Sequence, residues 1–113
     1  MKILDTEIEF DFLDADNVEK IETQIDITQS KIEEIDTDKL SDSIRKSCTI
    51  IRECFDNIFG KGTAKKIFGN KYSLTLCVRA FHELVEEKIN QEVEFEKQMN
   101  SFNDYLPNRI ERE

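Results

Sequence analysis

The first residues of the chain alternate between apolar and acidic side chains. Ile8, Phe10 and Phe12 occupy every second position, and glutamate or aspartate stands between them. Because successive side chains of a strand point to opposite faces, this pattern predicts a β-strand region over residues 2–13 with one buried face. The segment Ile3–Leu4 can form a short partner strand, which would complete a small hairpin. An isolated two-stranded ribbon is marginal in water, so this region has to pack on helices or pair with another copy.

A narrow apolar stripe follows, with alternating spacings of three and four residues. Asp16 stands three residues before Glu19, which is the arrangement of a capping box at a helix start. The stripe predicts an acidic helix with a coiled-coil-type seam. This seam consists of Val18, Ile21, Ile25, Thr28, Ile32 and Ile35. A stripe this thin fits either a peripheral helix of the same domain or the seam of an oligomer, and the sequence leaves both interpretations open.

A broader apolar face begins after a polar break over residues 36–39. Thr37 or Ser41 can cap a second helix, which is expected to run to Phe59. Its apolar residues recur every three or four positions and form a face wide enough to belong in the core. They are Leu40, Ile44, Cys48, Ile51, Phe55 and Ile58, with Ile50, Cys54 and Phe59 beside them.

Ser73 is placed to cap a third long helix that starts at Leu74. The buried face of this helix is expected to consist of Leu74, Cys77, Val78, Phe81, Leu84, Val85 and Ile89. Leu76 and Ala80 make the first turns apolar nearly all round, so these turns should be the most buried. The helix is expected to end near residues 103–106, before Pro107.

The stretch Phe55–Gly69 joins the second and third helices and contains all three glycines of the chain. It holds a near-repeat, Ile-Phe-Gly, at residues 58–60 and 67–69. Glycine tolerates the positive φ angles at which helices commonly end, so the last residue of each triplet fits a helix C-cap. Thr63 can cap one short helical turn between the two triplets. We call this stretch the corner.

Together these patterns predict a mainly α protein with three long helices and a short glycine-bounded helical turn at the corner. A small N-terminal β-strand or hairpin is added to the helices. At 113 residues the chain has the length of one domain. We expect a single helical domain over residues 1–106, which includes the strand region 2–13, and a flexible tail over residues 107–113.

The charge is spread unevenly over a chain whose net charge is -9. Residues 1–42 carry 14 acidic and 4 basic side chains, residues 43–82 carry 2 and 8, and residues 83–113 carry 9 and 4. The corner is therefore basic between two acidic segments, and either the fold compensates these charges internally or the corner docks an acidic partner. The lysines of such a patch would be Lys61, Lys65, Lys66 and Lys71. We expect no nucleic-acid partner, because the overall charge repels phosphate.

The side chains that usually carry enzyme chemistry are scattered. His82 is the only histidine, and the sequence predicts neither a partner nor a pocket for it. Cys48, Cys54 and Cys77 are an odd number without paired spacing, which argues against disulfides and zinc and for a reducing compartment. The segment Gly60–Thr63 lacks the spacing of a phosphate-binding P-loop. We therefore expect no enzyme, no cofactor and no metal.

No apolar run approaches the ~20 residues that a membrane helix needs. The chain starts with acids alternating with apolar residues, which is unlike the basic start and apolar run of a signal peptide. We therefore expect a cytoplasmic protein with no membrane partner.

The corner motif, Phe-x-x-Ile-Phe-Gly-x-Gly-Thr-x-x-x-Ile-Phe-Gly, resembles small proteins encoded in the tail gene clusters of bacteriophages of Gram-positive bacteria. These proteins are classed as tail assembly chaperones, and the order of strand region, acidic helix, corner and long helix is similar. The resemblance implies a non-enzymatic protein of the host cell cytoplasm. Such a protein binds the tape measure protein until tail tube subunits polymerise around it. The matching positions, implied to pack the corner or to offer an apolar docking surface, are Phe55, Ile58, Phe59, Ile67 and Phe68.

Other functions fit the same composition. An acidic inhibitor or regulatory protein, such as a DNA mimic or an antirepressor, would use the carboxylates of the flanking segments. A structural component of a phage tail would remain in the particle. A homo-oligomer, formed through the N-terminal strand or the seam of the first helix, is compatible with each of these functions.

Overall fold

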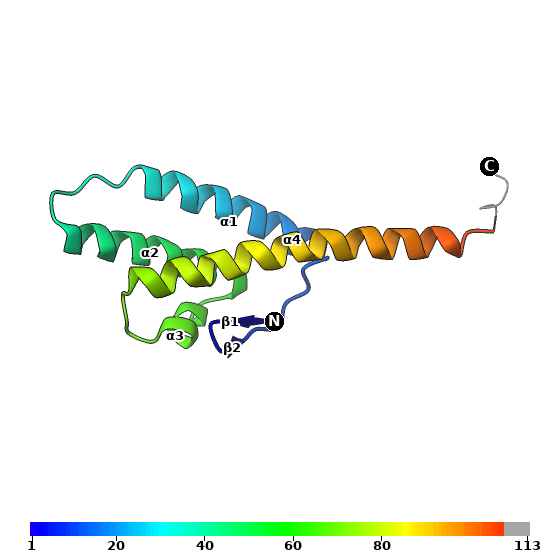
Figure 1. Cartoon of the computed structure of the whole chain (residues 1–113), viewed down its shortest axis with the longest axis horizontal. Coiled ribbons are helices and arrows are strands. Elements are labelled where there is room, and N and C mark those ends of the chain that lie inside the picture. The colour runs from blue at the N-terminus through cyan, green and yellow to red at the C-terminus, as the bar shows by residue number, and fades with distance from the viewer. Residues whose placement is uncertain (108–113) are drawn as a thin grey trace.

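A computed structural model of the chain describes residues 1–107. The described part is mainly α-helical and elongated, with extents of 66 × 27 × 20 Å (Figure 1). The elements in chain order are β1 (Lys2–Ile3), β2 (Thr6–Glu7), α1 (Ala15–Glu33), α2 (Leu40–Phe59), α3 (Thr63–Phe68) and α4 (Leu74–Asp104). These elements confirm the predicted fold class of three long helices, a short helix at the corner and a small N-terminal hairpin. The expected tail falls almost entirely outside the described residues.

The N-terminal region forms a hairpin that is much shorter than the predicted strand. β1 and β2 pair antiparallel, with Lys2 opposite Glu7. The turn contains no glycine, and Leu4 adopts a positive φ of 48° instead. The prediction of a strand through Phe12 was wrong, because this segment has no strand to pair with. Ile8 and Phe12 are nevertheless buried. The alternating pattern therefore comes from an irregular segment whose apolar side chains pack against the helices.

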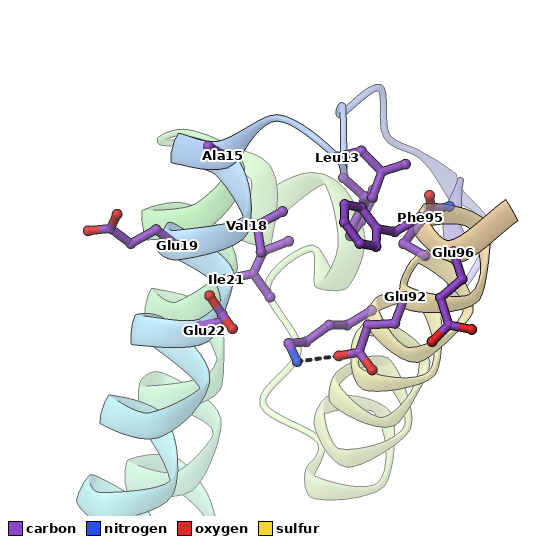
Figure 2. A pocket seen from close by; sticks show the side chains of 12 residues that line it. Leu13, Ala15, Val18, Glu19, Ile21, Glu22, Glu92, Phe95 and Glu96 are labelled. Atoms are coloured by element: carbon purple, nitrogen blue, oxygen red, sulfur yellow. Dashed lines mark hydrogen bonds and ion pairs between the residues drawn. The ribbon is translucent and has the colours of Figure 1, made fainter. Parts of the chain in front are cut away.

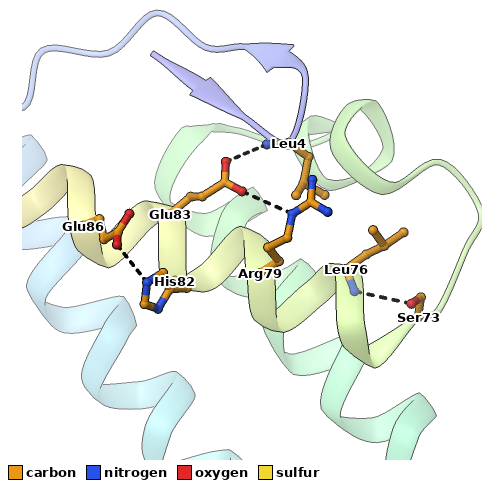
Figure 3. Close-up of polar contacts among 7 residues, drawn as sticks. All are labelled: Leu4, Ser73, Leu76, Arg79, His82, Glu83 and Glu86. Carbon is orange, nitrogen blue, oxygen red and sulfur yellow. Dashed lines mark hydrogen bonds and ion pairs between the residues drawn. The ribbon is translucent and has the colours of Figure 1, made fainter.

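Side-chain caps position two of the three long helices. At α1 the N-cap is Asp14, whose carboxylate accepts a hydrogen bond from Asn17 N at 3.1 Å, so the prediction of a cap at Asp16 was wrong by two residues. Asp16 lies in the first turn, where its charge favours the positive end of the helix dipole. At α4 the predicted cap is confirmed, since Ser73 Oγ accepts from Leu76 N at 3.3 Å (Figure 3).

The start of α2 differs from both predicted caps. Its N-cap is Lys39, which makes no capping hydrogen bond through its side chain. The hydroxyl of Thr37 is instead hydrogen-bonded to that of Ser43. The predicted end at Phe59 is confirmed.

The corner turns twice at glycines with positive φ. Gly60 ends α2 at φ 112° and Gly69 ends α3 at φ 63°, as the two Ile-Phe-Gly triplets predict. Thr63 is the first residue of α3 rather than its cap, and its hydroxyl donates to Gly60 O at 2.7 Å. Asp56 links α2 to α3, because its carboxylate accepts from the backbone N of Ala64 at 2.8 Å.

The core is organised around α2, against which α1, α3 and α4 each pack. On one side of α2, the Cys54 thiol donates to Gln24 O of α1 at 3.8 Å. On the other side lies the fully buried Cys77 of α4, which neighbours Cys48. Burial and the neighbouring Cys48 raise the pKa of the Cys77 thiol to about 12, against a smaller opposing effect of Arg52. Cys54 and Cys77 are both buried and therefore behave as small apolar side chains.

The packing of α4 differs from the prediction. Its buried residues are Cys77, Ala80 and Leu84. Three residues of the expected core face lie outside, because Leu74 is 39% exposed, Val78 is 52% exposed and Ile89 is 53% exposed. The exposed apolar surface of α4 is therefore larger than the sequence indicates.

One hydrogen bond ties the hairpin to α4, at a glutamate that also pairs with an arginine of the same helix (Figure 3). The Glu83 carboxylate accepts a hydrogen bond from Leu4 N at 3.1 Å, and its other oxygen lies 3.7 Å from Arg79 Nε. On the surface of α4, His82 pairs with Glu86 at 2.9 Å. The only histidine is thus an exposed partner in a side-chain hydrogen bond between successive turns of the helix.

Candidate functional site

Residues beside the buried face of α4 form a second, regular stripe, in which Phe81, Val85 and Lys88 are half-buried and Phe81 packs against the core. The residues of this stripe are spaced alternately four and three residues apart, which is the a/d repeat of a coiled coil and keeps one side of a helix facing a partner helix. This set, which we call the outward stripe, consists of Leu74, Val78, Phe81, Val85, Lys88, Glu92, Phe95, Met99 and Phe102. Its only charged members, Lys88 and Glu92, form an ion pair of 2.9 Å between Nζ and Oε1.

Much of the outward stripe is uncovered in the described structure. The exposed fractions of its side chains include 53% for Phe95, 44% for Met99 and 58% for Phe102. Two features of the fold cause this exposure. α1 and α4 pack on α2 without an extended contact to one another, and the C-terminal half of α4 projects past the other elements (Figure 1). Ile89 and Val93, which are 53% and 52% exposed, lie outside the stripe, so the exposed apolar surface of α4 is not confined to it. Exposed large apolar side chains on a projecting helix indicate an interaction surface.

A cleft of about 630 Å³ opens where the start of α1 faces the middle of α4 (Figure 2). Its apolar lining comes from Phe12, Leu13, Val18 and Ile21 on one side and from Phe95 on the other. The volume lies in the usual range for sites that bury apolar groups. We call it the α1–α4 cleft.

Acidic residues surround this apolar lining. Carboxylates come from Glu22 of α1 and from Glu92 and Glu96 of α4, whereas the carboxylate of Glu19, another lining residue, points away from the cleft (Figure 2). Among the residues that line the cleft, Lys88 is the one cation, and it is already paired with Glu92. The cleft therefore offers an apolar floor inside a negative rim, which favours an apolar ligand with positive charge around it.

The corner residues singled out by the resemblance lie mostly in the core. Phe55, Ile58 and Phe68 are buried, and Phe59 and Ile67 are half-buried and pack against them. The ring centroid of Phe55 lies 6.0 Å from that of Phe59 and 5.8 Å from that of Phe68. This arrangement serves corner packing and leaves little of the three buried residues for a partner.

The four lysines of the predicted basic patch lie around α3 and are all exposed. Arg52 of α2 joins them, since its guanidinium donates to Gly69 O at 3.0 Å and lies 4.9 Å from the centre of the Tyr72 ring. Within residues 1–107, no ion pair involves Lys61, Lys65, Lys66 or Lys71. The corner therefore presents a positively charged surface, formed by residues that do not line the acidic cleft.

The seam of the first helix is largely used inside the chain. Ile21 and Thr28 are buried, Val18, Ile25 and Ile35 are half-buried, and Ile32 is 36% exposed. α1 packs on α2, where Asn57 donates from its side chain to Gln24 at 3.1 Å. The packing of α1 on α2 fits the interpretation of this seam as that of a peripheral helix of the same domain. An oligomer could use only the part of the seam that α2 does not cover.

The sequence indicates a thin apolar stripe of Val93, Phe95, Met99 and Phe102 on a helix end that projects or pairs loosely, but sequence reasoning did not separate the outward stripe from the core face and missed the cleft. Part of the signal was present, because apolar residues recur at four-three spacing from Leu74 to Val85 and again from Phe95 to Phe102, with Lys88 and Glu92 at the two positions between. It was hidden by the core residues Cys77, Ala80 and Leu84, which interleave with it and make a single broad face. No local signal could have paired Val18 with Phe95, since the two sides of the cleft are far apart in the sequence.

Two searches of the described residues bear on other functions. Over residues 1–107, no group of three or more histidine, cysteine, aspartate or glutamate side chains is arranged to hold a metal ion. In the same range, no helix combines the length and the apolar composition needed to cross a membrane.

The fold and the cleft define a class of small, elongated helical proteins that carry an apolar groove with an acidic rim. The chain belongs to DUF6673, a family of unknown function, whose model matches residues 4–113. No curated protein and no solved structure matches the chain. Its function therefore has to be argued from the geometry of the molecule.

Proposed function

We propose that this protein is a non-enzymatic binding protein of the tail assembly chaperone type, which holds an α-helical partner during assembly. The observation that carries the proposal is the outward stripe of α4. It presents coiled-coil spacing and exposed phenylalanines on a body in which 36% of the residues are charged. A charged body with an uncovered apolar stripe suits a protein that keeps another apolar helix in solution.

The resemblance of the corner motif supplies the partner class. Tail assembly chaperones bind the tape measure protein, a long helical protein, before tail tube subunits polymerise around it. A coiled-coil stripe is the surface that such a helix would recognise. On this proposal the protein acts in the cytoplasm of the host cell, and a homo-oligomer would multiply the stripes available to one long partner.

A second function is favoured by the acidic residues alone. Residues 1–42 carry 14 acidic and 4 basic side chains, so an inhibitor or regulatory protein that imitates DNA would place its carboxylates there. Such a protein would bind a DNA-binding protein electrostatically and would not need the apolar stripe. A structural component of the phage tail is the third possibility, and it differs from a chaperone in remaining in the finished particle.

The test is co-expression of the protein with a helical fragment of the tape measure protein encoded nearest to it. We expect the soluble yield of the fragment to rise and the two proteins to co-purify. Recovery only of a DNA-binding protein would support the acidic regulator instead, and detection of the chain in purified mature particles would support the structural component. The chaperone proposal would fail if the fragment were equally soluble with and without this protein and did not co-purify with it.

A further inference from the structure

We infer that the α1–α4 cleft and the outward stripe together bind one amphipathic α-helix of another protein, with lysine or arginine beside its apolar seam. This inference rests on the proposed function and adds the site, the secondary structure and the charge of the ligand. The outward stripe extends from Leu74 to Phe102, about 42 Å of helix at 1.5 Å per residue. A single helix of that length would lie along it.

The ligand is a helix because of the spacing of the stripe. Alternating steps of four and three residues match the a/d seam of a facing helix, whereas a β-strand presents side chains with a period of two. The cleft lies on the same side of α4 as the stripe, because Phe95 and Glu92 belong to both. A helix that follows the stripe would therefore place one or two apolar side chains between Phe95 and Val18.

The charge of the ligand follows from the rim of the cleft. Glu22 stands on one side, Glu92 and Glu96 stand on the other, and Lys88 is occupied by its ion pair with Glu92. Lysine or arginine flanking an apolar seam would meet these carboxylates, whereas acidic flanks would be repelled.

The same charges disfavour a second copy of this chain as the occupant. The segments that supply α1 and the distal part of α4 are both acidic, with 14 acidic against 4 basic residues over 1–42 and 9 against 4 over 83–113. Packing α4 against α4, or α4 against the cleft of another copy, would bring carboxylates together. Like charges placed opposite one another across an interface cost binding free energy.

The Lys88–Glu92 ion pair would set the register of the ligand. It interrupts the outward stripe in the middle and becomes covered when a helix binds there. A polar layer inside an apolar seam specifies register because an apolar residue opposite it leaves charge desolvated. The favoured partner therefore has a polar residue at the position that faces this pair.

The experiment uses two synthetic helical peptides of about 25 residues with the same leucine seam, one flanked by lysine and one by glutamate. Binding to the full chain is measured by fluorescence anisotropy at low and high salt. We expect the lysine peptide to bind at least about tenfold more tightly than the glutamate peptide at low salt, and the difference to shrink as salt screens the rim.

Four variants locate the site. Phe95→Ala should weaken binding of the lysine peptide about tenfold or more, and Glu22→Lys should reduce or reverse the preference for it. The controls are Leu40→Ala, whose side chain is 77% exposed outside the cleft, and Glu9→Lys, an exposed carboxylate outside the cleft lining. Neither control should change binding by more than about twofold. Thermal melting by circular dichroism shows whether each variant is folded.

The outcomes separate this inference from the proposed function. Equal binding of both peptides, unaffected by Phe95→Ala and Glu22→Lys, would overturn the site and charge assignment while helix binding itself stood. Binding of neither peptide would overturn the inference, and the co-expression test would then decide the proposed function separately. Concentration-dependent dimers that Phe95→Ala dissociates would also overturn it, because the occupant would be a second copy.

Discussion

Replacing Phe55 by alanine tests whether the corner is the centre of the fold. The side chain is 0% exposed and its ring contacts those of Phe59 and Phe68, with centroids 6.0 and 5.8 Å away. Removing a buried phenylalanine forfeits about 1.5–3 kcal/mol of burial. The cavity left behind brings the usual total to about 3–5 kcal/mol. Alanine returns only about 0.5 kcal/mol through its better helix propensity.

The matched control is Phe95→Ala, the same substitution in another long helix at a side chain that is 53% exposed. Its lost burial is small and the same propensity gain applies, so we expect a change within about 0.5 kcal/mol. Urea unfolding followed by circular dichroism gives both free energies of unfolding.

The two results must differ by several kcal/mol for the argument to hold. A domain of this size has a total stability of about 5–15 kcal/mol, so Phe55→Ala should leave it close to unfolding. A loss below about 1 kcal/mol at Phe55 would show that the corner is not the packed centre. A loss above about 2 kcal/mol at Phe95 would show that α4 needs this side chain to fold, and would remove it as a free docking residue.

Three further predictions concern the turns and the buried thiol. Gly60→Ala should cost about 1–3 kcal/mol in urea unfolding, because φ 112° and ψ 153° favour glycine. Apart from residues 59–61, no atom lies within 4 Å of the added methyl, so the cost is conformational. Glu83→Ala removes the acceptor of Leu4 N and should speed amide hydrogen exchange there about fivefold or more. The pKa of Cys77 is raised from 9.0 to about 12 in the folded state, so the stability associated with its neutral thiol is present below pH 9 and is lost as pH rises toward 12. The slope is about 1.4 kcal/mol per pH unit, and Cys77→Ala should remove this share of the alkaline slope.

The features that could be predicted from the sequence are those that local chemistry decides. Ser73 caps α4, and Gly60 and Gly69 end α2 and α3, because a cap depends on a hydroxyl or a missing Cβ at one position. The cap of α1 was misplaced because Asp14 and Asp16 offer the same carboxylate two residues apart. Only the backbone angles, φ -84° and ψ 130° at Asp14, distinguish them.

The failures concern features that depend on tertiary contacts. An alternating segment becomes a strand only if another strand pairs with it, and the segment that ends at Phe12 has none. On α4 the sequence contains two interleaved apolar stripes, and helical periodicity cannot say which one packs on α2. The structure packs Cys77 and Leu84 there and leaves Leu74 and Val78 exposed. The candidate cleft was unpredictable for the same reason, because it exists only where the start of α1 faces the middle of α4.

The projecting half of α4 explains why its apolar side chains call for a partner. Local side-chain pairs support this half of the helix, including Lys88 with Glu92 at 2.9 Å and Gln91 with Glu87 at 2.9 Å. Each such i,i+4 pair stabilises a helix by about 0.2–0.5 kcal/mol without any tertiary contact. Polar residues at the outward positions would support the same helix equally well and would avoid exposing Phe102. Folding of the chain alone therefore does not account for the outward stripe, whereas a helix bound along it would.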